Sequence, residues 1–246
     1  MRYKITVEYD GTHLVGWQKQ KDGPSVQEFL EKAVAGFSHQ TVDVFGAGRT
    51  DAGVHALGQV AHFDLDADLS EYKIQESLNA LLRELQAPVA VINTEKVGDD
   101  FHARFSAIGR GYIYRMLNRR GASPLRTNRV WLVSYKLDID AMKEGAQFLL
   151  GNHDFSSFRG AGCQALSPVK TLDKLDINRV GDEIVFTVEA RSFIYHQVRN
   201  MVGTLMQVGC GKYTPIDVKR MLEAKDRTKA GISAPPCGLY LNKVMY

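Results

Sequence analysis

In the first hundred residues, segments with the two-residue hydrophobic period of a strand alternate with segments that have the 3.6-residue period of a helix. This order restricts the fold more than any other feature of the sequence. Residues 2–9 alternate apolar and polar side chains, which predicts a strand. Ser25 and Glu28 form a capping box before apolar residues at helical spacing, which predicts a helix. The other expected elements of this half are strands near 42–47, 58–64 and 89–97, and a helix that Ser70 caps and Pro88 ends. The order β-α-β-β-α-β is that of the split βαβ, or ferredoxin-like, unit.

The second half repeats this order of elements loosely, without a repeat of sequence. Gly181 and Asp182 mark a hairpin turn, and Thr214 with Pro215 marks the start of a helix. The expected elements are strands near 102–118, 130–136, 172–180, 184–190 and 239–246, and helices near 138–150, around 198–205 and from 215. We therefore expect an α+β protein with two parts, residues 1–100 and 101–246.

The composition is that of an ordinary globular protein. Hydrophobic residues make up 44% of the chain and charged residues 24%, which supplies enough apolar side chains for a core. No apolar run approaches the roughly 20 residues that cross a bilayer. The N-terminal residues lead directly into the first strand, so we expect no signal peptide and no association with a membrane.

The cysteines and histidines show no spacing typical of a metal site. The cysteine count is odd and no C-x-x-C occurs, so we expect a reducing cytoplasm and neither a disulfide framework nor a zinc ribbon. The seven histidines contain no H-E-x-x-H motif and no i, i+4 pair, and the glycines form no nucleotide-binding motif. We expect neither a metal nor a cofactor. The cysteines are Cys163, Cys210 and Cys237.

Positive charge is concentrated in one window of the chain. Residues 101–137 contain no Asp or Glu, although the net charge of the whole protein is only +3. Such segregation predicts a positive face that a phosphate backbone would neutralise. The alternative is a solvated basic face without a partner. The basic residues of the window are Arg104, Arg110, Arg115, Arg119, Arg120, Arg126, Arg129 and Lys136.

One short stretch offers a candidate catalytic group. Asp51 lies between Gly48 and Gly53, in a turn between two expected strands. A rigid scaffold commonly presents functional side chains in such turns. A carboxylate is ionised at neutral pH and suits a nucleophile or a stabiliser of positive charge. The alternative is an Asx-turn, in which the side chain caps only its own backbone.

Seven stretches in one order resemble the tRNA pseudouridine synthase A family. The resemblance runs from about residue 3 to residue 241 and therefore covers nearly the whole chain. The matching stretches are Y-D-G at 9–11 with G-W-Q at 16–18, G-R-T-D-A-G-V-H-A at 48–56, F-H-A-R-F-S-A at 101–107, Y-I-Y at 112–114, D-F-S-S-F-R at 154–159, V-R-N-M-V-G at 198–203 and G-L-Y-L at 238–241.

The resemblance implies a fold and an activity. The fold would be two ferredoxin-like halves joined through a continuous, mixed, mostly antiparallel sheet, with helices on one face and an RNA-binding cleft between the halves. The activity would be an isomerase, an intramolecular transferase that converts uridine to pseudouridine at nucleotides 38–40 of the tRNA anticodon stem-loop. The family also implies a homodimer that holds one tRNA between its subunits.

The family assigns the catalytic role to Asp51 and implies that Arg199 pairs with it. The sequence leaves open whether Asp51 attacks the sugar or the base. Arg49 would fill the space of the flipped uridine or hold the adjacent phosphate; its alternative role is simple charge pairing. For Arg199, on an otherwise apolar helix, the alternative is a boundary residue that reaches solvent.

The other expected site residues bind the substrate. The resemblance places Tyr112 and Leu239 in the wall of a uridine pocket, where the Tyr112 ring would stack on the flipped base. The alternatives are a core aromatic on a strand, beside Tyr114, and an ordinary core strand at the C-terminus. Arg104, Arg110 and Arg115 are expected phosphate contacts that position the RNA without reading its sequence. His102 and Lys136 are weaker candidates for the same role.

Two other functions compete with this interpretation. A non-catalytic RNA-binding module or RNA chaperone on the same fold would use only the arginine-rich face, with steep salt dependence. A hydrolase acting on a glycosidic bond would use Asp51 with a second carboxylate as general acid. No motif in the chain offers that second carboxylate.

Overall fold

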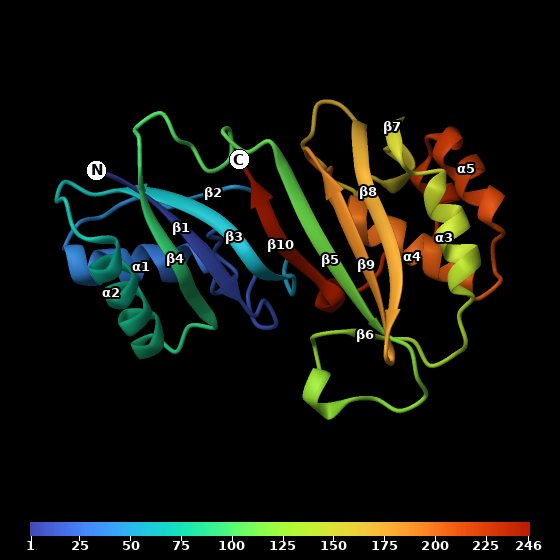
Figure 1. The fold of residues 1–246 in the computed structure, drawn as a ribbon, viewed down its shortest axis with the longest axis horizontal. Coiled ribbons are helices and arrows are strands. Elements are labelled where there is room, and N and C mark those ends of the chain that lie inside the picture. Colours follow the sequence, from blue (N-terminus) through green and yellow to red (C-terminus); the bar gives the residue numbers. More distant parts are fainter. The chain divides into compact units, whose positions relative to one another are not determined.

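The computed structural model describes residues 1–246 and divides them into two compact units (Figure 1). The first unit comprises Met1–Ile108 together with Tyr240–Tyr246, and the second comprises Gly109–Leu239. The expected boundary between residues 100 and 101 differs from this division in two places. Residues 101–108 and the end of the chain both belong to the first unit.

Specific contacts hold these two segments to the first unit. The Arg2 guanidinium donates to the carbonyl oxygen of Phe101 at 2.8 Å. The hydroxyl of Tyr246 donates to the carbonyl oxygen of Ala103 at 2.8 Å. These bonds link residues 99 and 143 positions apart, which explains why local sequence patterns placed the boundary elsewhere.

The first unit has the expected order of elements. They are β1 (Arg2–Tyr9), α1 (Val26–Ser38), β2 (Phe45–Gly46), β3 (His55–Asp64), α2 (Glu71–Glu84), β4 (Val89–Val97) and the returning β10 (Leu239–Met245). The sheet runs β4-β1-β3 with antiparallel neighbours. The edge of β3 that does not pair with β1 has two partners: β2 pairs antiparallel with one end of it, and β10 pairs parallel with the other end.

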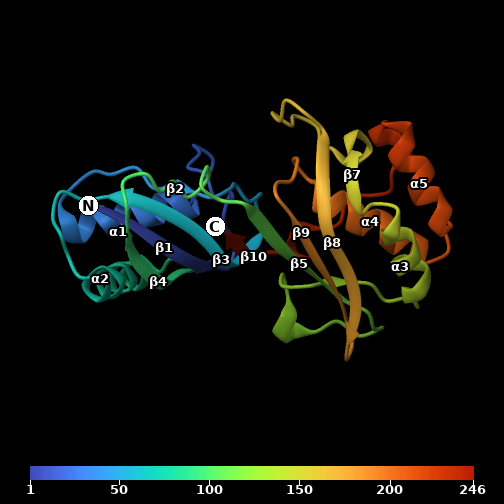
Figure 2. The ribbon, with the colours of Figure 1, turned by 45° about the horizontal axis from the view of Figure 1, so that its top comes forward.

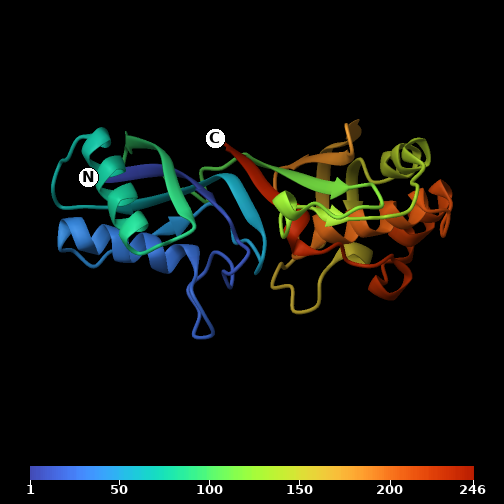
Figure 3. The same cartoon turned by 90° about the horizontal axis from the view of Figure 1, so that it is seen from below.

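Local chemistry sets the two helices of this unit. Ser25 accepts a hydrogen bond from the Glu28 amide and Ser70 accepts one from the Lys73 amide, so both expected N-caps are confirmed. The helices contact one another, and Figure 3 shows α1 lying along one side of the strands. Alternate residues of β1 form the core of this layer and are buried. They are Tyr3, Ile5, Val7 and Tyr9.

The opposite face of this sheet carries a second, smaller core. Residues 101–108 cross it, and Ala103 packs with Ala47 and Val60. His62 is buried on this face, where its Nδ1 accepts a hydrogen bond from the Ala103 amide at 3.2 Å. Burial is the main cause that lowers the pKa of His62 to about 4, and the neighbouring His102 and Arg2 contribute to the same shift. The ring is therefore neutral at physiological pH.

The second unit is built on an antiparallel sheet in the order β5-β9-β8-β7. Its helices α3, α4 and α5 contact one another, and α3 also contacts β8 (Figure 2). The elements are β5 (Gly109–Leu117), β6 (Trp131–Leu132), α3 (Ile139–Gln147), β7 (Gly151–Asp154), β8 (Val169–Val180), β9 (Glu183–Ala190), α4 (Gln197–Gly209) and α5 (Pro215–Ala224). The α+β class is confirmed.

Two expected strands of this unit are shorter than their sequence pattern suggested. The strand expected from residue 102 begins only at Gly109, because 102–106 form a turn in which the Ser106 amide donates to the His102 carbonyl at 2.9 Å. The strand expected over 130–136 is reduced to Trp131–Leu132. In both places alternating apolar residues occur in irregular backbone.

The helix α4 is the core element of the second unit. Every one of its residues except Arg199 is buried. Its buried Asn200 donates from Nδ2 to the carbonyl oxygen of Phe158 at 2.8 Å, so this polar side chain keeps a partner. Gly203 permits residues 231–234 to cross the helix, since a Cβ there would overlap the carbonyl oxygen of Ile232. No helix of the protein, α4 included, has the length and apolar character of a membrane span.

Replacing His62 by Asn should reduce the loss of stability in acid, because Asn retains an acceptor for the Ala103 amide and does not titrate. The unfolded chain binds a proton near pH 6.5 and the folded protein only near pH 4, so wild-type stability falls as the pH drops through this window. Between pH 7.5 and 4.5 the wild type should lose about 2.5 kcal/mol more unfolding free energy than the variant. Urea unfolding at both pH values measures this difference. Equal losses would contradict the burial of a neutral ring.

Candidate active site

Asp51 lies in the loop between β2 and β3, where the sequence predicted a turn. The Val54 amide donates to the Asp51 carbonyl at 3.1 Å and closes the turn. Gly53 has a φ of +76°, a conformation that favours glycine. The Asp51 side chain is half-buried and Arg49 is exposed. The turn thus presents a partly shielded carboxylate next to an exposed cation.

Hydrogen bonds from the core fix the residues on the N-terminal side of Asp51. The hydroxyls of Tyr9 and Thr50 are joined at 2.8 Å in a buried position. The Trp17 amide donates to the Thr50 carbonyl at 3.1 Å. The Gln59 side chain donates to the Gly48 carbonyl at 2.9 Å. Because these partners come from β1, from the loop after it and from β3, the turn is held on a rigid support.

Two glycines allow the loop between β1 and α1 to press against this turn. A Cβ on Gly16 would overlap the Thr50 carbonyl oxygen, and Gly16 has a φ of +109°. A Cβ on Gly11 would overlap the carbonyl oxygen of Val54. The Y-D-G and G-W-Q stretches therefore form the underside of the Asp51 turn. Periodicity gave no sign of these supporting residues; only the family resemblance drew attention to the two stretches.

Tyr112 lies on β5 at the edge of the second unit's core. It is half-buried, and its ring meets Phe193 edge to face with centroids 5.2 Å apart. Tyr114, two residues further on the same strand, is fully buried and donates from its hydroxyl to the Pro235 carbonyl at 2.8 Å. Burial raises the pKa of Tyr114 well above its usual value. Tyr114 is therefore the aromatic residue of the core, whereas Tyr112 lies at the edge of the core and is partly open to solvent.

Arg199 is the one half-buried residue of α4, and it anchors a neighbouring segment. Its Nε donates to the Ala234 carbonyl at 2.8 Å, and the Ala234 amide donates back to the Arg199 carbonyl at 3.0 Å. The guanidinium also lies 3.1 Å from Nε2 of His196. These contacts hold residues 231–234 against α4, and Leu239, which follows them in the chain, is buried.

In the folded protein, acidic residues from another part of the chain neutralise some of the positive charge of the arginine-rich window. Arg115 and Arg126 both pair with Glu183, at 2.8 and 3.0 Å. Arg119 pairs with Asp182 at 3.1 Å. These acids come from the turn between β8 and β9, far along the chain. The field expected from the whole window is therefore partly cancelled, and Arg115 is a poor candidate for a phosphate contact.

Arg104 and Arg110, the other two expected phosphate contacts, lie in different units. Arg104 is exposed, with its guanidinium 5.6 Å from the centre of the Phe105 ring. Arg110 is half-buried on β5 and donates to the Arg191 carbonyl at 3.0 Å. The first unit thus carries Asp51, Arg49 and Arg104. The second unit carries Tyr112, Arg110, Arg199 and Leu239.

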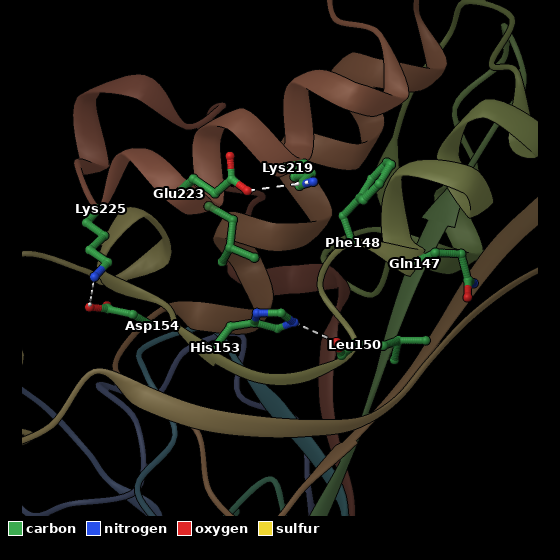
Figure 4. A pocket seen from close by; sticks show the side chains of 9 residues that line it. Gln147, Phe148, Leu150, His153, Asp154, Lys219, Glu223 and Lys225 are labelled. Atoms are coloured by element: carbon green, nitrogen blue, oxygen red, sulfur yellow. Dashed lines mark hydrogen bonds and ion pairs between the residues drawn. The ribbon is translucent and has the colours of Figure 1, made fainter.

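A hollow of about 350 Å³ in the second unit contains none of the expected site residues (Figure 4). Its ionic groups pair with one another, since Lys225 lies 3.7 Å from Asp154 and Lys219 lies 3.8 Å from Glu223. Nε2 of His153 lies 2.7 Å from the carbonyl oxygen of Leu150. With its charges satisfied internally, this hollow offers no candidate chemistry. It is lined by Gln147, Phe148, Leu150, His153, Asp154, Lys219, Leu222, Glu223 and Lys225.

Comparison with known protein families shows to which family the protein belongs. The family described as tRNA pseudouridine synthase matches residues 5–106 and 146–246. These ranges include the Asp51 turn, its supporting glycines and α4. The protein belongs to this family. The expected isomerase activity, conversion of uridine to pseudouridine, is thereby confirmed.

Individual relatives resemble the protein over its whole length. A tRNA pseudouridine synthase A from Rhodospirillum centenum is 55% identical over 245 residues, which cover 100% of this chain and 99% of the relative. The protein of the same name from Paramagnetospirillum magneticum is also 55% identical, over 100% of this chain and 95% of the relative. The one from Maricaulis maris is 54% identical, over 100% and 98%.

Gly16→Ala should disturb the Asp51 turn, because the added Cβ overlaps the Thr50 carbonyl and the backbone φ is positive. We expect a loss of about 1–3 kcal/mol in unfolding free energy and a fall in isomerase turnover. Gly48→Ala is the matched control in the same loop, since nothing lies within 4 Å of its Cβ position. Chemical denaturation and turnover assays compare the two variants. Equal effects of both substitutions would refute the role given to the close approach.

Proposed function

We propose that the protein isomerises uridine to pseudouridine at nucleotides 38–40 of the tRNA anticodon stem-loop, with Asp51 as the nucleophile. The observation that carries this proposal is the half-buried Asp51 carboxylate on a turn fixed by Tyr9, Trp17 and Gln59. The names of the relatives support tRNA as the substrate. A homodimer and a cytoplasmic location are proposed from the family resemblance.

In this reaction the catalytic carboxylate must above all be held in a fixed position. The bond from ribose C1′ to uracil N1 breaks, the base turns, and a bond forms from C1′ to C5. The C5 proton leaves, N1 gains a proton, and no electrons are exchanged with a cofactor. Asp51 would either bond to the reacting uridine transiently or stabilise the positive charge that develops at the sugar. Both roles benefit from a carboxylate that does not move during the reaction.

The uridine must leave its base stack to reach Asp51, at a cost of a few kcal/mol. Arg49 is exposed on the same turn, so it is placed to occupy the vacated space or to hold the neighbouring phosphate. Tyr112 and Leu239 are proposed as walls of the uridine pocket. Arg199 is proposed as the ion-pair partner of Asp51, and Arg104 and Arg110 as phosphate contacts.

Asp51→Ala and Asp51→Asn should each lower turnover by about 10³-fold or more, because both remove the carboxylate. Tritium release from tRNA carrying 5-tritiated uridine measures loss of the C5 proton, and mapping the product identifies the nucleotides. Asp43→Ala removes an exposed carboxylate from the segment before β2; it is the control and should leave turnover unchanged. Release by Asp51→Ala at the wild-type rate would remove Asp51 from the mechanism. A folded wild type that binds tRNA without releasing tritium would favour an RNA-binding module.

Tyr112→Phe tests whether the Tyr112 hydroxyl takes part in the chemistry. If the hydroxyl assists proton transfer at C5, turnover should fall by about 10²-fold while tRNA affinity and thermal stability stay near wild type. Tyr114→Phe is the structural comparison, since it loses the bond to Pro235 and should cost about 1 kcal/mol of stability. Full turnover by Tyr112→Phe would restrict this residue to stacking and packing.

A further inference from the structure

A group of aromatic rings lies on the first unit, on the sheet face that faces away from its helices. The rings belong to Phe45, His62, His102 and Phe105, and we refer to them as the aromatic platform. Ring centroids lie 5.2 Å apart for Phe45 and His62, 4.6 Å for His62 and His102, and 4.4 Å for His102 and Phe105. The rings form one continuous set, of which His62 is the buried base.

The two phenylalanines of the platform are exposed to solvent, although phenylalanine side chains are usually buried. Phe105 is 76% exposed and Phe45 is 47% exposed. Single exposed apolar residues are common on protein surfaces, but a contiguous exposed group indicates a binding surface. Phe105 contributes an apolar ring to solvent while little of it is buried, so its hydrophobic side chain adds little to folding.

The exposed ring is also held rigidly. Residues 102–106 form a tight turn in which Nδ1 of His102 accepts from the amides of Arg104 and Phe105, at 3.1 and 3.4 Å. The hydroxyl of Ser106 accepts from the His102 amide at 2.9 Å. A turn that is fixed before binding loses little conformational entropy when a ligand stacks on it.

The two histidines of the platform act as flat neutral rings. Both Nδ1 atoms are occupied as hydrogen-bond acceptors, His62 from the Ala103 amide and His102 from its own turn. Burial lowers the pKa of His102, and Arg2 and Arg104 lower it further, as burial does for His62. These rings therefore offer π-surfaces and no positive charge. His102 is accordingly better suited to stacking than to a phosphate contact.

Charge around the platform is asymmetric and gives a direction to any bound strand. The Arg104 guanidinium lies over the Phe105 ring at 5.6 Å. At the other end, Phe45 borders a hollow whose lining includes Asp43 and Asp66, together with Asp64, which pairs with Arg2 at 2.8 Å. A phosphate backbone would be attracted to the Arg104 end and repelled from the acidic end.

We propose that the aromatic platform stacks a nucleobase of the tRNA other than the uridine that is isomerised, with the adjoining phosphate on the Arg104 side. Phe105 supplies the stacking face, as aromatic residues do in proteins that bind unstacked RNA bases without reading their sequence. The proposal rests on the proposed function for the identity of the ligand. It adds a second RNA contact, on residues that take no part in the chemistry.

The test is the affinity of Phe105 variants for unmodified tRNA, measured by fluorescence anisotropy. Phe105→Ala should weaken binding about five- to a hundredfold, the range found for removal of one base-stacking ring. Phe105→Leu, apolar but without a π-face, should lose most of that affinity, whereas Phe105→Trp should retain it. Tyr72→Ala is the matched control, because Tyr72 is 77% exposed on α2 of the same unit and should have no effect.

Salt dependence separates stacking from charge. Phe105→Ala should lower affinity by the same factor at every salt concentration, since no phosphate contact is lost. Arg104→Ala should reduce the slope of log affinity against log salt by about 1. Wild-type affinity for Phe105→Leu, or an effect of Phe105→Ala no larger than that of Tyr72→Ala, would overturn the proposal.

Two further measurements separate the proposal from its alternatives. Sedimentation equilibrium shows whether Phe105→Ala changes the oligomeric state. If affinity falls only because the oligomer dissociates, the platform binds a second copy of the chain and the proposal fails. Tritium release in the same samples reports the proposed function independently, since a wild type that binds tRNA through Phe105 but releases no tritium would refute only the catalytic proposal.

Discussion

The first unit depends on one close approach, that of the loop after β1 to the turn that carries Asp51. Gly11 and Gly16 have no side chains, so the backbone of this loop reaches the carbonyls of Thr50 and Val54. The hydroxyls of Tyr9 and Thr50 complete the contact inside the core. A buried hydrogen bond between two uncharged groups adds modest stability, but leaving either group unpaired costs more. The turn therefore has one favourable position.

The same strand that supports the turn also supports the aromatic platform. β3 begins at His55, directly after the turn, and reaches His62 before it ends. The helix-covered face of its sheet is filled by ordinary apolar packing, whereas the other face holds a neutral imidazole, a small apolar core and the 101–108 segment. The Asp51 carboxylate adjoins one end of β3 and the aromatic platform packs on His62 near its other end, so the two keep a constant separation. Such a fixed separation suits a substrate that is itself a rigid, folded RNA.

Sequence patterns predicted the parts of this structure that local chemistry controls. The caps at Ser25 and Ser70 and the β-α-β-β-α-β order depend on residues within a few positions of one another. The strand expected from residue 102 exists, but its start was placed too early, because a turn that is stabilised by His62 shows the same alternation as a strand. The basic window was overestimated for the same reason, since Asp182 and Glu183 reach its arginines only in the folded protein.

Glu183 and Asp182 neutralise three arginines of the basic window, which gives those arginines a structural role. Glu183 is buried and accepts both Arg115 and Arg126, so this cluster stabilises the end of a hairpin. A paired cation attracts phosphate weakly, because its field is cancelled a few ångströms away by the carboxylate. Arg49 and Arg104 are both exposed, and each lies beside a fixed element of the first unit, the Asp51 turn or the Phe105 ring. Net charge is therefore a poor guide to where a phosphate would bind. Exposure and a position beside a rigid carboxylate or ring distinguish the proposed RNA contacts, Arg49 and Arg104, from the arginines that stabilise the fold.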